Sequence, residues 1–381
     1  MAARYASDDI VRNIFNAGRV LSKAQYIYTE EEAKEPFFAV LHEIDWIVEA
    51  IPTILSIKAD VYFAVVISQT PYQVTHLGDG TFVVLVDQRA FYMLLTLCLR
   101  IQTLSPFCDH FGFSGVSCDK DYAGKFLLDI AKDFVFHTSN VAPFLKPEQS
   151  RLIYQAASTY IIGHEIAHVA HGHLDFKASS EFPLFATSND DRNLTLRTLE
   201  MDADSSATTS VFDVFERYLN RVLQSAQLPL EKSPDEIRLS VREQYVAGMF
   251  IALLYMDALS DNFAPAAYPI SYARFLTTFD VVRTVLTRVQ ADYIPERMRQ
   301  LLVAVFERLS GGIGTLGHPI ASNVMVIDGD LERPSYEYND LGIAAGLEHL
   351  QPLHNRWALI RPFLERYQRG GRLAPARAVP I

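Results

Sequence analysis

The chain has 381 residues, of which 49% are hydrophobic and 21% are charged, a composition typical of globular proteins. Its formal net charge is −11 and it has no basic run, which argues against nucleic acid or an anionic membrane surface as a partner. Its three cysteines, Cys98, Cys108 and Cys118, form no CxxC pair, so the sequence favours the reducing cytoplasm over a disulfide framework.

The sequence offers no segment for export or for crossing a membrane. No apolar stretch follows the arginine of the N-terminal MAARYASDDIVRN, so we expect no signal peptide. The longest uncharged apolar run, YVAGMFIALLYM at 245–256, has 12 residues. That is too short to span a bilayer, and it predicts a buried helix instead.

The N-terminal part of the chain changes character twice. Its segments are predicted as helices over 8–56, strands over 60–68 (DVYFAVVIS) and 81–87 (TFVVLVD) with a turn at HLGDG between them, a helix over 88–103, a loop over 104–124 and a helix over 122–136. The strands are recognised by their β-branched and aromatic residues. Together they predict a small antiparallel sheet.

Helices dominate the remainder of the chain. They are predicted over 147–171 with Gly172 as the C-terminal cap, over 196–223, from the capping box Ser233–Glu236 to Leu259, over 269–290, over 294–309, and in a last helix ending near Gln368. Residues 174–195 are expected to be a polar surface excursion. The sequence thus predicts an α+β fold, mostly α.

The chain exceeds the usual limit for one hydrophobic core, so we expect either one large domain with appended helices or two domains. The predicted units are an N-terminal helical segment (1–56), a core (57–290) and a C-terminal helical segment (291–381). The residues from about 369 onward, RGGRLAPARAVPI, are predicted to be a flexible tail.

The stretch IIGHEIAHVAHGHLDF contains an HExxH motif formed by His164, Glu165 and His168. Residues at i and i+4 lie about 40° apart on an α-helix, so the two histidines share a face and can bind one zinc ion. Glu165 is turned by about 100° and can reach a water molecule beside the metal. A histidine-rich surface helix is the alternative, but the apolar flanking residues oppose it because unpaired buried histidines are costly.

A catalytic zinc usually has three protein ligands, so a third is expected. The HExxHxxGxxH pattern is excluded, because His171 and Leu174 stand where glycine and histidine would be required. In RTLEMDAD, Glu200 and Asp204 are four residues apart and face one side of a helix. Glu200 alone would be taken for an ordinary exposed acid, but behind an HExxH motif we favour it as the ligand, with Asp204 fixing the tautomer of a ligand histidine.

HEIAHVAHGH followed by RTLEMDAD resembles the glutamate-type zinc metallopeptidases, or gluzincins. The pattern HExxH…ExxAD is similar to that of the CAAX prenyl protease and heat-shock protease superfamily, and to the soluble phage-exclusion peptidase Lit. The resemblance implies a zincin-like core, Zn²⁺, a protein or peptide substrate, and His164, His168 and Glu200 as ligands. It also implies Glu165 as the base and Asp204 as a support, and it makes the LGDGTFVVLVD hairpin the candidate for the edge strand that binds an extended peptide.

In that superfamily a later His-Pro motif, with arginine six residues after the histidine, helps to hold the substrate oxyanion. Here Tyr268 stands at the histidine position and Arg274 at the arginine position, and a phenol can also donate to an oxyanion. His318, which precedes a proline, is the other candidate, but no arginine lies six residues after it.

His171 and His173 are expected at the solvent-exposed end of the HExxH helix, although His171 lies on the same face as His164 and could instead line the pocket. Asp202 is expected to point into solvent. The leading hypothesis is a soluble, cytoplasmic zinc endopeptidase without a membrane span. A defence or toxin-like protease that acts on one host protein and a non-catalytic zinc scaffold are the alternatives, and the presence of Glu165 argues against the scaffold.

Overall fold

The computed structural model describes residues 4–5, 25–26, 46–112 and 147–375, with gaps at 49, 68–70, 79, 225–232, 264–270 and most of 290–339. Most of the helix predicted before residue 46, the helix predicted over 122–136 and most of that over 294–309 lie outside these residues. The described part is mostly helical and contains one small sheet, as the α+β prediction required.

The sheet is mixed rather than antiparallel. Its main strands are β3 (Asp60–Ile67), β4 (Tyr72–Gly78) and β5 (Thr81–Asp87). The short strands β1 (Arg4–Tyr5) and β2 (Gln25–Tyr26) pair with β3, and the described strands follow the order β1-β3-β5-β4. β3 pairs in parallel with β5, whereas β4 pairs antiparallel with β5.

The strand that the sequence analysis missed, β4, explains the parallel pairing. Gly78 and Gly80 take positive φ values of 113° and 74° at the hairpin predicted around HLGDG, and the hairpin joins β4 to β5. β4 lies at the edge of the described sheet and carries the chain back before β5 begins, so β5 runs in the direction of β3. Gln73, Thr75 and His76 make its sequence polar, which hid it from a search for apolar strands.

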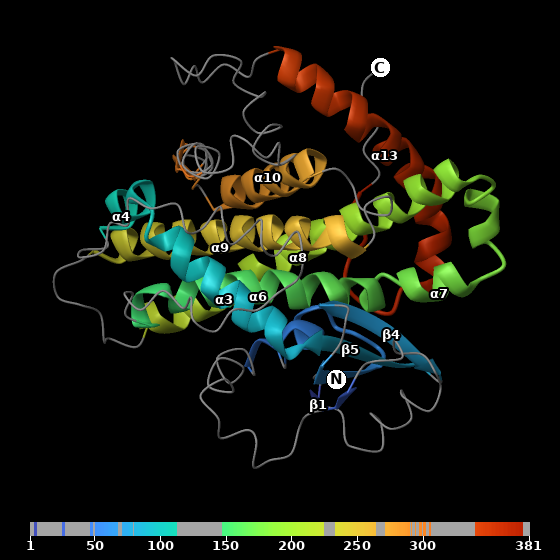
Figure 1. The fold of residues 1–381 in the computed structure, drawn as a ribbon, viewed down its shortest axis with the longest axis horizontal. Coiled ribbons are helices and arrows are strands. Elements are labelled where there is room, and N and C mark those ends of the chain that lie inside the picture. Colours follow the sequence, from blue (N-terminus) through green and yellow to red (C-terminus); the bar gives the residue numbers. More distant parts are fainter. Residues whose placement is uncertain are drawn as a thin grey trace.

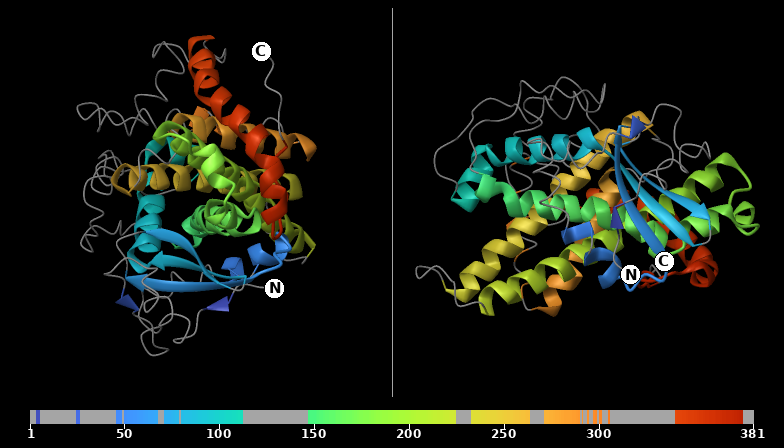
Figure 2. Two further views of the ribbon diagram at one scale, coloured as in Figure 1. Left: turned by 90° about the vertical axis from the view of Figure 1, so that its right-hand side faces the viewer. Right: turned by 90° about the horizontal axis from the view of Figure 1, so that it is seen from below.

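Helices cover one face of the sheet (Figures 1 and 2). They are α3 (Gln88–Gln102), α4 (Ser105–Phe111), α6 (Pro147–Ala170), α7 (His173–Ala178), α8 (Asn189–Gln224), α9 (Pro234–Phe263), α10 (Ser271–Arg288) and α13 (Asp340–Tyr367). In both figures α6 lies next to the sheet, and α9 and α10 lie farther out. The capping box predicted before α9 is present, because Glu236 accepts hydrogen bonds from the backbone N–H and hydroxyl of Ser233.

α6 is the central helix because small residues let its neighbours approach closely. A Cβ atom added at Gly248 of α9 would lie 2.4 Å from the carbonyl oxygen of Ile153 in α6, and one at Gly163 of α6 would lie 3.4 Å from the Cα of Ala207 in α8. Both glycines therefore allow backbone-to-backbone packing. This packing fixes the crossing of α6 and α8, on which the candidate site is built.

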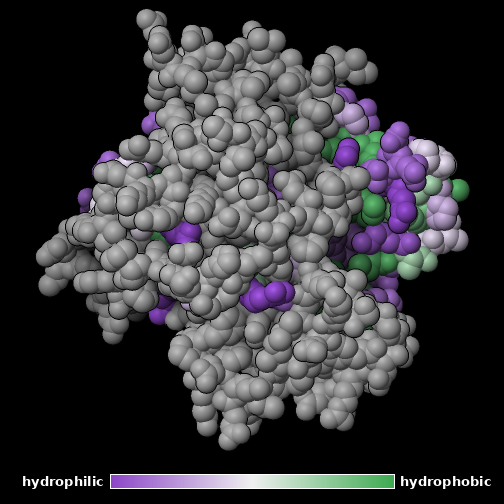
Figure 3. Space-filling model, in the orientation of Figure 1, coloured by the Kyte–Doolittle hydropathy of each residue, from purple (hydrophilic) through white to green (hydrophobic). Residues whose placement is uncertain are grey.

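The segment predicted as a surface excursion contains α7, the 3₁₀ helix η3 (Phe182–Phe185) and the start of α8. α7, η3, α8 and α13 share a second hydrophobic cluster that includes Phe176, Leu199 and Trp357. Figure 3 shows polar and hydrophobic side chains mixed on the surface at this end of the molecule. Leu184 of η3 is 65% exposed there.

The residues after α13 are packed at least as far as 375, which differs from the predicted flexible tail. The N–H groups of Arg369 and Gly370 donate to the carbonyl oxygen of Ala170, at 2.8 and 3.0 Å, and so satisfy the C-terminal end of α6. The N–H of Gly371 donates to Leu55, and Leu373 is buried. Arg369 and Gly370 are held in place because they satisfy a carbonyl that the end of α6 leaves unpaired.

In the described part of the chain, no single helix has the length and apolarity needed to cross a membrane. α3 from Arg89 and α4 meet that test only as a pair, and the two are bent by 78° relative to each other. The predicted domain boundaries stay a prediction.

Candidate metal centre

Two crossing helices bring the side chains of the HExxH and ExxAD motifs together. α6 carries His164, Glu165 and His168 near its C-terminal end, and α8 carries Glu200 and Asp204 across from them. Nε2 of His164 lies 3.3 Å from Nε2 of His168 and 3.0 Å from Oε2 of Glu200. Nε2 of His168 lies 3.6 Å from Oε1 of Glu200. The three side chains therefore present one donor atom each to a common point.

The spacing of these donors fits a zinc ion. Zinc binds histidine nitrogen and carboxylate oxygen at about 2.0–2.2 Å in a tetrahedral arrangement, for which neighbouring ligand atoms are about 3.3–3.5 Å apart. The 3.3 Å between the two histidine nitrogens matches that value, and the two oxygens of Glu200 lie 3.0 Å from His164 (Oε2) and 3.6 Å from His168 (Oε1). Three protein ligands would leave a fourth position open for water or substrate.

Charge in the site also favours a cation. Nδ1 of His164 lies 2.9 Å from Oδ1 of Asp204, so its ring touches a carboxylate on each side. Burial alone would lower the pKa of His164, but hydrogen bonds with Asp204 and Glu200 raise it to about 10. Burial alone would raise the pKa of Glu200, but His168 and His164 hold it well below its usual value. The carboxylates thus require a positive charge at the centre, from a proton or from a metal ion.

Glu165 follows His164 on α6 but takes no part in the candidate metal-binding cluster. Its side chain is half-buried, and it accepts no hydrogen bond from any described residue. A carboxylate that is not already paired with a hydrogen-bond donor is available to accept a proton.

Arg274 of α10 lies behind the metal centre. Its Nε and Nη2 atoms donate to the two carboxylate oxygens of Asp204, each at 2.8 Å, and Asp204 in turn faces Nδ1 of His164. Arg274 is 2% exposed and Asp204 is fully buried. This placement differs from the predicted oxyanion contact, because Asp204 and the ring of His164 separate Arg274 from the donor atoms. Tyr268 and His318, the other two oxyanion candidates, lie outside the described residues.

A second cluster of buried polar side chains adjoins the first, and here the sequence-based expectation was wrong. His173 and Asp202 were expected in solvent, as was His171 in the favoured of its two readings, but His171, His173 and Asp202 are 1%, 0% and 1% exposed. Oδ2 of Asp202 makes a very short contact with Nδ1 of His171 and lies 3.1 Å from Nε2 of His173. Burial lowers the pKa of His173 to about 3, although Asp202 acts in the opposite direction, so this ring is neutral.

The error has a tertiary cause. Gly172, with φ of 74°, ends α6 and turns the chain so that His173 begins α7 over the end of α6. The segment after α13 then covers Asp202, whose Oδ1 accepts the N–H of Ala374 at 3.2 Å. One local signal did exist, since Asp202 lies between the apolar residues Met201 and Ala203, which is typical of a helix buried on several sides.

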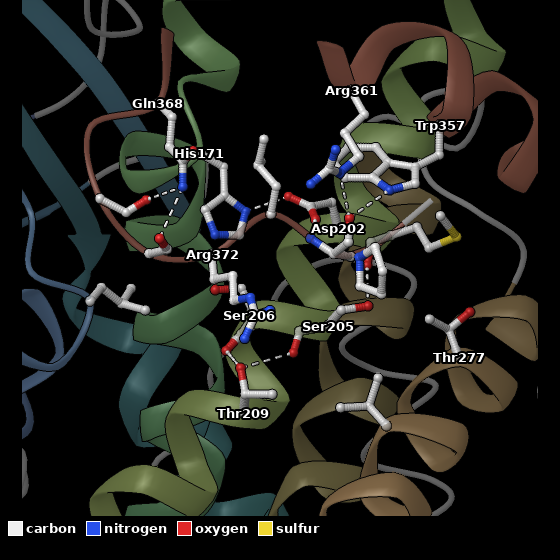
Figure 4. Close-up of a pocket in the computed structure, with 18 of the residues that line it drawn as sticks. His171, Asp202, Ser205, Ser206, Thr209, Thr277, Trp357, Arg361, Gln368 and Arg372 are labelled. Atoms are coloured by element: carbon white, nitrogen blue, oxygen red, sulfur yellow. Dashed lines mark hydrogen bonds and ion pairs between the residues drawn. The ribbon is translucent and has the colours of Figure 1, made fainter. Parts of the chain in front are cut away.

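The described residues also line a cavity of about 1110 Å³ between α8, α10, α13 and the C-terminal segment. His171 and Asp202 lie on its wall, together with the hydroxyl side chains of Ser205, Ser206 and Thr209 (Figure 4). His164, Glu165 and His168 do not line it. This cavity therefore adjoins the second cluster and does not open onto the HExxH residues.

A helical fold that converges two histidines and a glutamate beside a second, unpaired glutamate defines a candidate metal-dependent hydrolase site. Residues 147–288 match the family model described as Peptidase U49. The match spans α6 to α10 and includes both clusters, so it supports a peptidase and hence a protein or peptide substrate. No significant match was found among curated proteins or among solved structures.

Proposed function

We propose that the chain is a cytoplasmic zinc-dependent endopeptidase of the glutamate type, with a zincin-like core. The convergence of His164, His168 and Glu200 at tetrahedral spacing carries this proposal. The peptidase match over 147–288 and the resemblance of HExxH…ExxAD to the gluzincins support it independently.

His164, His168 and Glu200 would hold the metal, and Asp204 would keep the N–H of His164 on Nδ1. The Nε2 lone pair of His164 then faces the metal centre. A bound zinc ion supplies a Lewis acid that polarises a peptide carbonyl and makes water more acidic. Glu165 accepts the proton of the attacking water and passes it to the leaving amine, so that one peptide bond breaks for each water consumed.

We propose that the substrate binds in an extended conformation along β4. β4 is an edge strand of the described sheet, and it packs against α6, the helix that carries the HExxH motif. The free edge of a strand offers backbone N–H and C=O groups that pair with an extended peptide whatever its side chains. Of the two strands of the hairpin, β4 is the outer one, and it supports this placement of the peptide.

Replacement of Glu165 by glutamine tests the proposal. The amide keeps the shape of the side chain but accepts no proton, so we expect hydrolysis of a proteome-derived peptide library to fall by roughly 10²-fold or more, with zinc retained. Glu365→Gln on α13, whose side chain is 50% exposed, is the matched control and should cleave like the parent. Equal cleavage by Glu165→Gln and the parent would show that Glu165 is not the base.

The same library separates the alternative functions. A protease directed at one host protein should leave the peptides intact but cleave one protein in a lysate, in a zinc-dependent manner. A zinc scaffold should cleave neither. The unpaired carboxylate of Glu165 favours an enzyme, because a structural zinc site does not need a base.

A further inference from the structure

His173 lies between a proposed metal ligand and a buried carboxylate. Its Nδ1 is 2.9 Å from Nδ1 of His168, and its Nε2 is 3.1 Å from Oδ2 of Asp202. All three residues are buried, with at most 5% of their surface exposed, so water has little access to these contacts. The two nitrogens of His168 therefore point in different directions. Its Nε2 faces the other proposed metal-binding side chains, and its Nδ1 faces His173.

The positions of the protons follow from the donor and acceptor rules for histidine. A neutral imidazole that binds a metal through Nε2 carries its hydrogen on Nδ1, so His168 must donate from Nδ1. Nδ1 of His173 must then accept and carries no hydrogen, which leaves the hydrogen of this ring on Nε2. That hydrogen points at Asp202, a carboxylate that accepts it. The three residues form one chain in which every hydrogen bond runs towards Asp202.

The same rules decide whether the second cluster can hold its own metal ion. His171, His173 and Asp202 are close enough together to bind one. To be a ligand, Nε2 of His173 would need a free lone pair, and the hydrogen would move to Nδ1. Two N–H groups would then face each other across the 2.9 Å between His168 and His173. With zinc on His168, the second cluster is therefore a hydrogen-bonded support and not a second metal site.

We propose that His173 and Asp202 are positioning residues that fix the tautomer and the ring orientation of His168 for zinc. This inference rests on the proposed zinc site. A ligand histidine usually donates its outer ring N–H directly to a carboxylate or a carbonyl group. Here a second histidine, His173, stands between the ligand histidine His168 and the carboxylate of Asp202. Asp204 does the same for His164 directly, so the two ligand histidines have supports of different lengths.

The carboxylate at the end of this chain is itself held by the C-terminal segment. Oδ1 of Asp202 accepts the N–H of Ala374, and His171 occupies Oδ2 beside His173. Gly371 allows the segment to approach, because a Cβ atom there would lie 2.8 Å from Nε2 of His171. The last described residues therefore help to hold the support of a metal ligand.

The protonation pattern can be measured directly on the unmodified chain. Zinc-loaded protein labelled with ¹⁵N-histidine gives long-range ¹H–¹⁵N correlations that distinguish a protonated ring nitrogen from an unprotonated one. We expect His173 to carry its hydrogen on Nε2 and His168 to carry its own on Nδ1. A hydrogen on Nδ1 of His173 in the zinc-loaded protein would overturn the inference, whatever any variant does.

Zinc affinity, measured by competition with a chromophoric chelator, tests the role of the chain. His173→Leu removes the acceptor and should weaken zinc binding by about 10–100-fold. His173→Asn places a carboxamide oxygen close to the position of Nδ1 and should recover most of that loss. His171→Leu is the matched control, since it also loses a contact with Asp202 but does not touch His168, and it should change affinity by less than about 3-fold.

The outcomes separate this inference from the proposed function. A parent that binds no zinc refutes the proposed function, and the inference falls with it. A parent that binds zinc with unchanged affinity in His173→Leu refutes the inference alone. Two zinc ions in the parent, with one lost in both His171→Leu and His173→Leu, would show that the second cluster is a metal site.

Discussion

Arg274→Gln should destabilise the protein strongly, because it strips a buried carboxylate of its charged partner. Arg274 and Asp204 form a two-pronged ion pair with both donor–acceptor distances at 2.8 Å, and the two side chains are 2% and 0% exposed. Removing one partner of such a pair leaves an uncompensated buried charge and costs about 3–5 kcal/mol. We expect a loss of that size in the free energy of unfolding.

A double-mutant cycle isolates the pair. Asp204→Asn should cost a similar amount, but the double variant lacks both charges of this pair, so its loss should be smaller than the sum of the single losses by about 2–3 kcal/mol. The measurement is urea unfolding followed by circular dichroism on chelator-treated protein. The control is Arg283→Gln on the same helix, whose ion pair with Asp280 is 64% and 32% exposed and should contribute less than about 1 kcal/mol.

The result also tests the earlier assignment of Arg274 to the substrate oxyanion. If Arg274→Gln is as stable as Arg283→Gln but cleaves peptide far more slowly at saturating substrate, Arg274 acts on the substrate and the reasoning from its burial is refuted. If stability and zinc affinity fall together, Arg274 acts through Asp204 on His164.

Three further results are expected. Glu200→Ala should lose its zinc on dialysis, as shown by elemental analysis, and a metal-loaded variant would refute its role as a ligand. Gly172→Ala should lower the free energy of unfolding by about 1–3 kcal/mol, since φ is 74° there and the added Cβ would lie 2.3 Å from the carbonyl oxygen of Tyr367. Gly112→Ala is the control and should cost less, because φ is 67° there but nothing lies within 4 Å of the added Cβ. Burial alone would raise the pKa of Asp204, but Arg274 lowers it to about 2. The ionised Asp204 therefore contributes roughly 2–3 kcal/mol to the free energy of unfolding, which is present above pH ~4 and is lost as the pH falls towards 2. Acid unfolding of Asp204→Asn should lack that part of the pH dependence.

Features that depend on spacing within one helix could be predicted from the sequence. The positions of His164 and His168 on one face, and of Glu200 and Asp204 on another helix, follow from the helical period. The structure brings the first three of these within one ligand cluster. Their roles in binding zinc stay predictions, as does that of Glu165.

Features that depend on distant segments could not be predicted in this way. Asp202 was assigned to solvent because the helical period places it on another face from Glu200, but α7 and the residues after α13 cover that face. The sheet was expected to be antiparallel because the polar edge strand β4 carries no apolar signal. In both cases a tertiary contact decided what the local pattern left open.

Zinc content, determined together with X-ray absorption at the zinc edge on the purified parent chain, tests the central claim most directly. The account predicts about one zinc per chain, with two imidazole nitrogens at about 2.0–2.1 Å and oxygen in the remaining positions. His164→Ala should lose that signal, and Glu165→Gln should retain it. A parent chain that carries no zinc and takes none up when zinc is added would contradict the account.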